Sequence, residues 1–111
     1  MQIAPIGLGF SVADGEHVEL TFRDGDLVLR FIDWREQPVE HCFVDAIGFR
    51  WSTHASVETP RDDTTYQVLD SAWLTDEVRS EGYEIGDFGH YVLCFNAEKV
   101  LEVLSRLVPN P

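Results

Sequence analysis

The stretch HVELTFRDGDLVLRF, residues 17–31, constrains the fold most strongly, because Asp24-Gly25 lies between two runs of alternating apolar residues. An Asp-Gly pair in that setting is the strongest short-range signal of a two-residue β-hairpin turn. With Arg23 opposite Asp26, the apolar residues share one face and the charged residues share the other, as cross-strand pairing requires. The expected partners are Phe22 with Leu27, Leu20 with Leu29, Val18 with Phe31, and Glu19 with Arg30. The segment therefore predicts an antiparallel hairpin.

Three further segments have strand patterns. Residues 39–51, VEHCFVDAIGFRW, carry apolar residues mainly on one parity and predict one long strand with a bend or bulge from Asp45 to Gly48. TYQVLDSAW, residues 65–73, predicts another strand, and the almost wholly apolar HYVLCF, residues 90–95, is typical of a central strand covered on both faces. The intervening residues 52–65 are polar, contain a proline and have no period, which predicts a loop.

Helical signals follow the strand that is predicted over residues 65–73. Thr75 can cap a helix, Asp76 and Glu77 suit its positive N-terminal end, and Gly82 can stop it. Residues 96–108, NAEKVLEVLSRLV, are ambiguous, because their apolar spacing fits a helix capped by Asn96 and also the second strand of a hairpin that turns there. The periodicity slightly favours the helix.

The length and composition bound the fold class. A chain of 111 residues with 44% hydrophobic residues is expected to form one globular domain, residues 1–111. We expect a mainly β, antiparallel domain of five or six strands with one short helix. It becomes α+β if the C-terminal segment is also helical.

Negative charge excludes several classes of partner. Twenty acidic residues against eight basic ones give a net charge of -12, which repels nucleic-acid phosphates and anionic membrane surfaces and attracts basic proteins. The N-terminal residues lack the pattern of a signal peptide, and no apolar run reaches the length of a membrane helix. We therefore expect a cytoplasmic protein that binds neither nucleic acid nor membrane.

No motif for catalysis, cofactor binding or metal binding stands out. The four histidines are dispersed, and Asp62-Asp63 lacks the spaced acids of a calcium loop. Cys42 and Cys94 lie in strand-forming surroundings and are expected to be buried, reduced thiols, although a disulfide stays open if the two strands are neighbours. We expect neither an enzyme nor a metal or cofactor site.

Two sets of polar or amphipathic residues are expected to have structural roles. Trp34, Trp51 and Trp73 end strand patterns, where an indole usually closes the edge of a core. Three aspartates interrupt or end apolar strands, where an unpaired buried carboxylate is costly, so each should pair with an arginine, cap a turn or stay at the rim. These are Asp33, Asp45 and Asp70.

The clearest candidate for a binding surface is DSAWLTDEVRSEGYEIGD, residues 70–87. Residues 62–87 contain eight acids and one base, Arg79, so this part of the chain carries -7 of the total -12. Apolar anchors are interleaved with the acids, and such anchors are what an interface needs in addition to charge. The candidate partner-binding residues are Trp73, Asp76, Glu77, Glu81, Tyr83, Glu84 and Asp87.

The order of LVLRFIDWREQPVEHCFVDAIGFRW, DSAWL and GHYVLCFNAEKVLEVLS resembles that of small acidic bacterial immunity proteins encoded beside polymorphic toxins. The resemblance covers about residues 26–105. It implies an inhibitor that binds a cognate toxin domain, often a basic nuclease, and it favours a strand at residues 100–105. The resemblance does not identify any binding residue in this sequence. The alternative is a small-molecule binding module or minor enzyme with His41, Asp45 or His90 in a pocket on the sheet.

Overall fold

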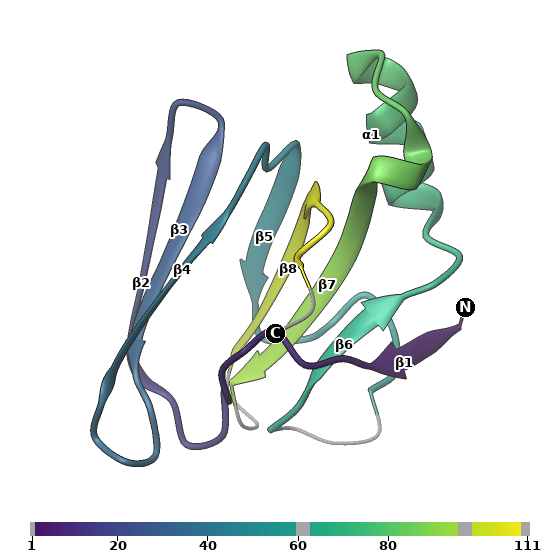
Figure 1. The fold of residues 1–111 in the computed structure, drawn as a ribbon. Helices are drawn as coiled ribbons and strands as arrows, with labels where there is room; N and C mark the ends of the chain where they lie inside the picture. Colours follow the sequence, from purple (N-terminus) through teal and green to yellow (C-terminus); the bar gives the residue numbers. More distant parts are fainter. Residues whose placement is uncertain (1, 60–62, 96–98, 110–111) are drawn as a thin grey trace.

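The computed structural model describes residues 2–59, 63–95 and 99–109, which form two antiparallel sheets packed face to face (Figure 1). The larger sheet has the order β1 (Ile3–Pro5), β6 (Thr65–Val68), β7 (Phe88–Phe95), β8 (Lys99–Arg106) and β5 (Gly48–Ser52). The smaller sheet contains β2 (Glu16–Arg23), β3 (Asp26–Ile32) and β4 (Pro38–Phe43). A helix, α1 (Ala72–Glu81), and a short 3-10 turn, η1 (Ile85–Asp87), complete the described elements. The mainly β class with a short helix is confirmed, but the described ranges contain eight strands in two sheets, so the expected number of five or six strands is wrong.

The β2–β3 hairpin has most of its expected register. Arg23 pairs with Asp26, and Asp24 and Gly25 have φ of 53° and 86°, as a two-residue primed turn requires. The expected pair of Val18 with Phe31 is wrong, because the register shifts between Glu16 and Glu19. His17, with a φ of 55°, lies in that irregularity.

The expected single strand over residues 39–51 is also wrong. β4 pairs with β3 in the smaller sheet, whereas β5 pairs with β8 in the larger one. The chain crosses between the sheets at residues 44–47, where Asp45 has a φ of 49°. A bend predicted from the sequence is therefore a complete change of sheet.

The C-terminal segment is a strand, so the slight preference for a helix is wrong. β8 pairs with β7 from Phe88 opposite Arg106 to Phe95 opposite Lys99. Both faces of β8 are covered, so its apolar residues do not alternate with polar ones. Their spacing therefore resembled that of a helix. The expected cap at Asn96 lies outside the described residues.

The core has two sides, separated by the larger sheet. Between the sheets lie the inward side chains of β3, β4, β7 and β8, with Leu27, Leu93 and Leu101 fully buried. The other face of the larger sheet is covered by α1 at one end and by Ala55 and Val57 of the polar loop at the other. All residues of β7 are buried, which confirms the predicted central strand.

Helix α1 begins one turn earlier than the sequence predicted. Ser71 is the N-cap, and its Oγ accepts a hydrogen bond from the backbone N–H of Leu74 at 3.0 Å. Thr75 is already inside the first turn, so its expected capping role is wrong. Asp76 and Glu77 consequently lie beyond the first turn. The predicted stop at Gly82 is confirmed by its φ of 76°.

The three strand aspartates have the expected structural partners. Buried Asp33 accepts hydrogen bonds from the backbone N–H groups of Gln37 and Arg35, and the Gln37 bond is the main cause of the lowered pKa of Asp33. Asp45 accepts a hydrogen bond from Arg106 at 2.9 Å, and Asp70 accepts one from the N–H of Gln2 at 2.7 Å.

Two predictions about burial, for Cys42 and Trp34, are wrong, and both residues belong to the smaller sheet or its turn. Cys94 is buried as expected, but Cys42 is exposed, and the two cysteines are not joined by a disulfide. Cys42 and its cross-strand partner Val28 belong to the face of the smaller sheet that is turned away from the core. Trp34 is 59% exposed at the turn between β3 and β4, so it does not close the core edge. Trp51, by contrast, packs on Phe95 with ring centroids 5.8 Å apart.

Candidate functional site

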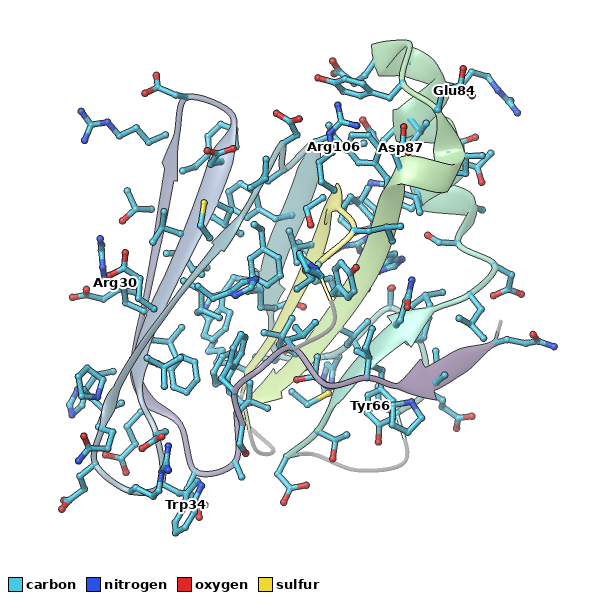
Figure 2. The ribbon with its side chains drawn as sticks, in the orientation of Figure 1. Arg30, Trp34, Tyr66, Glu84, Asp87 and Arg106 are labelled. Carbon is cyan, nitrogen blue, oxygen red and sulfur yellow. The ribbon has the colours of Figure 1, made fainter. Side chains whose placement is uncertain are left out.

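The structure places the predicted acids on α1 and the segment that follows it, and we call this region the acidic surface. Five residues supply its charge: Asp76, Glu77, Glu81, Glu84 and Asp87. Glu77 is half-buried and the other four are exposed. Among them, Tyr83 and Ile85 expose 38% and 49% of their surface. Figure 2 shows Glu84 and Asp87 at the α1 end of the molecule, so charge and apolar anchors do occur together there.

Trp73, the remaining candidate residue, lies mainly within the fold. Its half-buried ring contacts the His90 ring edge-on, with centroids 5.3 Å apart. The guanidinium of Arg50 lies 4.3 Å from the centroid of the Trp73 ring. Trp73 therefore supports the packing of α1 on the larger sheet.

Besides Arg79 on α1, a second arginine, Arg106 at the end of β8, lies next to the acidic surface. The Arg106 guanidinium donates to Asp45 at 2.9 Å and lies 3.8 Å from a carboxylate oxygen of Asp87 (Figure 2). It also lies 5.1 Å from the Tyr83 ring centroid and 4.7 Å from that of Phe88. The hydrogen bond to Asp45 is the main cause of the raised pKa of Arg106. Arg106 thus offsets part of the charge near Asp87.

A buried chain of polar groups lies beneath α1, and it was not predicted. Ser71 Oγ lies 2.7 Å from His90 Nδ1, and His90 Nε2 lies 2.8 Å from Glu102 Oε1. Ser56, in the polar loop, donates to Glu102 from its backbone N–H at 2.8 Å and from its Oγ at 2.6 Å. His90 is 1% exposed and Glu102 is 0% exposed. The chain connects the loop, β8, β7 and the start of α1.

The acceptor atoms around His90 determine which of its ring nitrogens carries a proton. The carboxylate of Glu102 can only accept, so His90 carries a proton on Nε2. In the neutral ring, Nδ1 then accepts from the Ser71 hydroxyl, whose oxygen accepts from Leu74 N–H. Burial acts to raise the pKa of Glu102, but the hydrogen bonds from His90 and Ser56 outweigh it and hold that pKa below its ordinary value. These hydrogen bonds offset the free-energy cost of burying the Glu102 carboxylate.

The order serine, histidine and carboxylate is also the order of nucleophile, base and orienting group in hydrolases. A cavity of about 210 Å³ lies beside Ser71 and is lined partly by Gln67, Thr75 and Phe88. Ser71 itself is only 6% exposed, however, and its oxygen is already used to cap α1. The observed hydrogen bonds therefore use Ser71 to cap α1 and to hold the ring of His90 in place.

A sequence signal for the buried chain does exist. Glu102 shares strand parity with Val100 and Leu104, so reading VLEVL as a strand places the carboxylate on a covered face. That placement requires a buried donor, and His90 is one of the few histidines in an apolar strand. The prediction of a helix over this segment did not place Glu102 on a covered sheet face, so it gave no reason to expect a buried hydrogen-bond donor.

Acid should remove the stabilisation that Glu102 provides. The folded-state pKa of Glu102 lies below its unfolded value, so the stabilisation is present above the unfolded pKa and is lost as the pH falls through the folded pKa. The free energy of unfolding should therefore differ most between wild type and Glu102→Gln near neutral pH, and the difference should shrink below about pH 4. Urea unfolding at a series of pH values measures this. A difference that stays constant into acid would contradict the role of the carboxylate.

Within the described ranges, no three His, Cys, Asp or Glu side chains gather to form a metal site, and no helix is both long and apolar enough to span a membrane. No protein-family model matches the chain, and no curated protein or solved structure matches it significantly.

Proposed function

We propose that this protein is a non-enzymatic protein-binding module of the immunity type, which neutralises a basic, nuclease-like toxin domain. The observation that carries the proposal is the acidic surface, where four exposed carboxylates lie on the same segment of the chain as the exposed side chains of Tyr83 and Ile85. Charge steers a basic partner, while apolar anchors provide lasting contact. The resemblance to immunity proteins supports the same assignment.

Inhibition would follow from occlusion. A nuclease binds phosphates with lysine and arginine side chains, and carboxylates can occupy the same groups. The protein surface behind the carboxylates would then exclude the nucleic acid from the toxin. This mechanism requires no catalytic residue and no metal in the inhibitor.

The proposal is tested by recovering the partner from the source organism by pull-down with mass spectrometry, and then measuring its binding kinetics. Reversing the charges of Glu81, Glu84 and Asp87 together should slow association by about tenfold or more at low salt and weaken its salt dependence. Tyr83→Ala should mainly speed dissociation, by a factor that corresponds to about 2 kcal/mol. Circular dichroism of each variant checks that the fold is intact.

Reversal of three exposed acids elsewhere, Glu16, Glu19 and Glu58, is the matched control, because it changes the net charge equally. The control should alter association less than the triple change on the acidic surface. A partner that binds all these variants with the same rate constants would refute the proposal.

The alternative is a small-molecule binding module or minor enzyme, and one observation favours it. The buried Ser71–His90–Glu102 chain ends beside the cavity at Ser71. A fluorophosphonate probe that labelled Ser71 in the wild type but not in Ser71→Ala would support the alternative against the proposed function.

A further inference from the structure

A groove of about 290 Å³ separates the tip of the β2–β3 hairpin from the C-terminal end of α1. Both elements reach the same end of the molecule, the upper end in Figure 1. We call this the hairpin–helix groove. Its lining residues are Phe22, Gly25, Asp45, Ala46, Ile47, Glu81 and Tyr83.

The lining has the chemistry of a site for a planar cation. Asp45 and Glu81 supply two carboxylates, and the set contains no basic residue. Phe22 and Tyr83 supply aromatic rings that are 53% and 38% exposed. A guanidinium is weakly hydrated, stacks on aromatic faces and pairs with carboxylates through several donors. The groove lining therefore combines the negative charge and the aromatic rings that bind an arginine side chain.

Arg106 shows that these groups can hold a guanidinium. It lies over the Tyr83 ring at 5.1 Å and donates to Asp45 at 2.9 Å. Asp45 and Tyr83 both also line the groove. Glu81 has no ion pair among the described residues, so it is available for a second cation.

We propose that the hairpin–helix groove takes an arginine side chain of the basic protein partner. The inference rests on the proposed function and adds one defined contact to it. Glu81 pairs with the incoming guanidinium, and the Phe22 and Tyr83 rings supply the aromatic lining. Asp45 adds negative charge, although its Oδ2 already accepts a hydrogen bond from Arg106.

The test uses two blocked tripeptides as probes, acetyl-Gly-Arg-Gly-amide and acetyl-Gly-Lys-Gly-amide, titrated into the ¹⁵N-labelled protein. The arginine peptide should shift the amide signals of Gly25, Ala46, Ile47 and Tyr83. The lysine peptide should bind about threefold more weakly, because a compact ammonium gains less from aromatic walls.

A pair of single-charge variants makes the test specific. Glu81→Gln should weaken binding of the arginine peptide by about fivefold, whereas Glu84→Gln should change it by less than about twofold. Both residues are exposed and belong to the same acidic surface, but Glu84 does not line the groove. Phe22→Ala and Ile85→Ala form the corresponding apolar pair, of which only the first should weaken binding.

Equal losses in Glu81→Gln and Glu84→Gln, equal binding of the two peptides, or shifts spread over the whole acidic surface would each overturn the groove proposal. Those results would leave the proposed function standing, because partner binding depends on the acidic surface as a whole. Conversely, a partner insensitive to the triple charge reversal, which includes Glu81, would reject the proposed function and with it the groove as a partner contact, even if the tripeptides gave arginine-selective shifts.

Discussion

Replacing Glu102 with alanine is expected to lower the free energy of unfolding by about 3–5 kcal/mol, since it breaks a buried charged network by removing one partner. The substitution leaves the Nε2–H of His90 and both donors of Ser56 without their acceptor. Glu102 and His90 are 0% and 1% exposed, so water cannot replace the carboxylate without local opening. Equilibrium unfolding in urea, followed by circular dichroism, measures the change.

Two controls separate this effect from general loss of charge. Glu40→Ala removes an exposed glutamate that pairs with Arg30 at 3.3 Å, and it should cost less than about 1 kcal/mol. Replacing both His90 and Glu102 with leucine removes the unmatched Nε2–H of His90 and leaves only the donors of Ser56, an exposed residue, so this double variant should be more stable than Glu102→Ala. A cost for Glu102→Ala no larger than that of Glu40→Ala would show that the buried chain does not stabilise the fold.

Leu93→Ala is expected to destabilise the protein by about 2–5 kcal/mol, because it opens a cavity between the two sheets. Leu93 lies in the central strand β7, is 0% exposed and belongs to the core that joins both sheets. Thermal and urea unfolding both report the loss.

Leu107→Ala is the matched control for Leu93→Ala. Leu107 is 48% exposed just beyond β8, so its truncation removes the same atoms from a partly hydrated site. Its effect should remain below about 1 kcal/mol. Similar costs at both positions would mean that the space between the sheets is less tightly packed than the burial indicates.

Local signals predicted the parts of the fold that depend on neighbouring residues. Asp24-Gly25 predicted the hairpin turn, and Gly82 predicted the end of α1, because each position requires a positive φ. The sheet to which a strand belongs depends on distant partners. For that reason residues 39–51 resembled one strand although β4 and β5 pair with different sheets.

The residues of the candidate site could also be predicted only in part from the sequence. Clustering of acids and aromatics predicted a binding surface around Tyr83; the structure leaves Tyr83 and four of the five acids exposed, and binding by this surface stays a prediction. The role of Arg106 and the position of Phe22 across the groove from Glu81 could not be predicted, because both depend on which distant segments the two sheets bring to this end of the molecule. The local sequence gives no sign of that arrangement.

The topology of the larger sheet has a consequence for the order of folding. The smaller sheet consists of consecutive strands, so β2, β3 and β4 can pair as soon as they are synthesised. In the larger sheet, β1 pairs with β6 and β5 pairs with β8, and both pairs join segments that are far apart in the chain. Such long-range closure is slow compared with hairpin formation. During synthesis, β5 therefore remains without its strand partner until β8 has left the ribosome, and in that interval the backbone edge that later binds β8 can pair with another chain and aggregate.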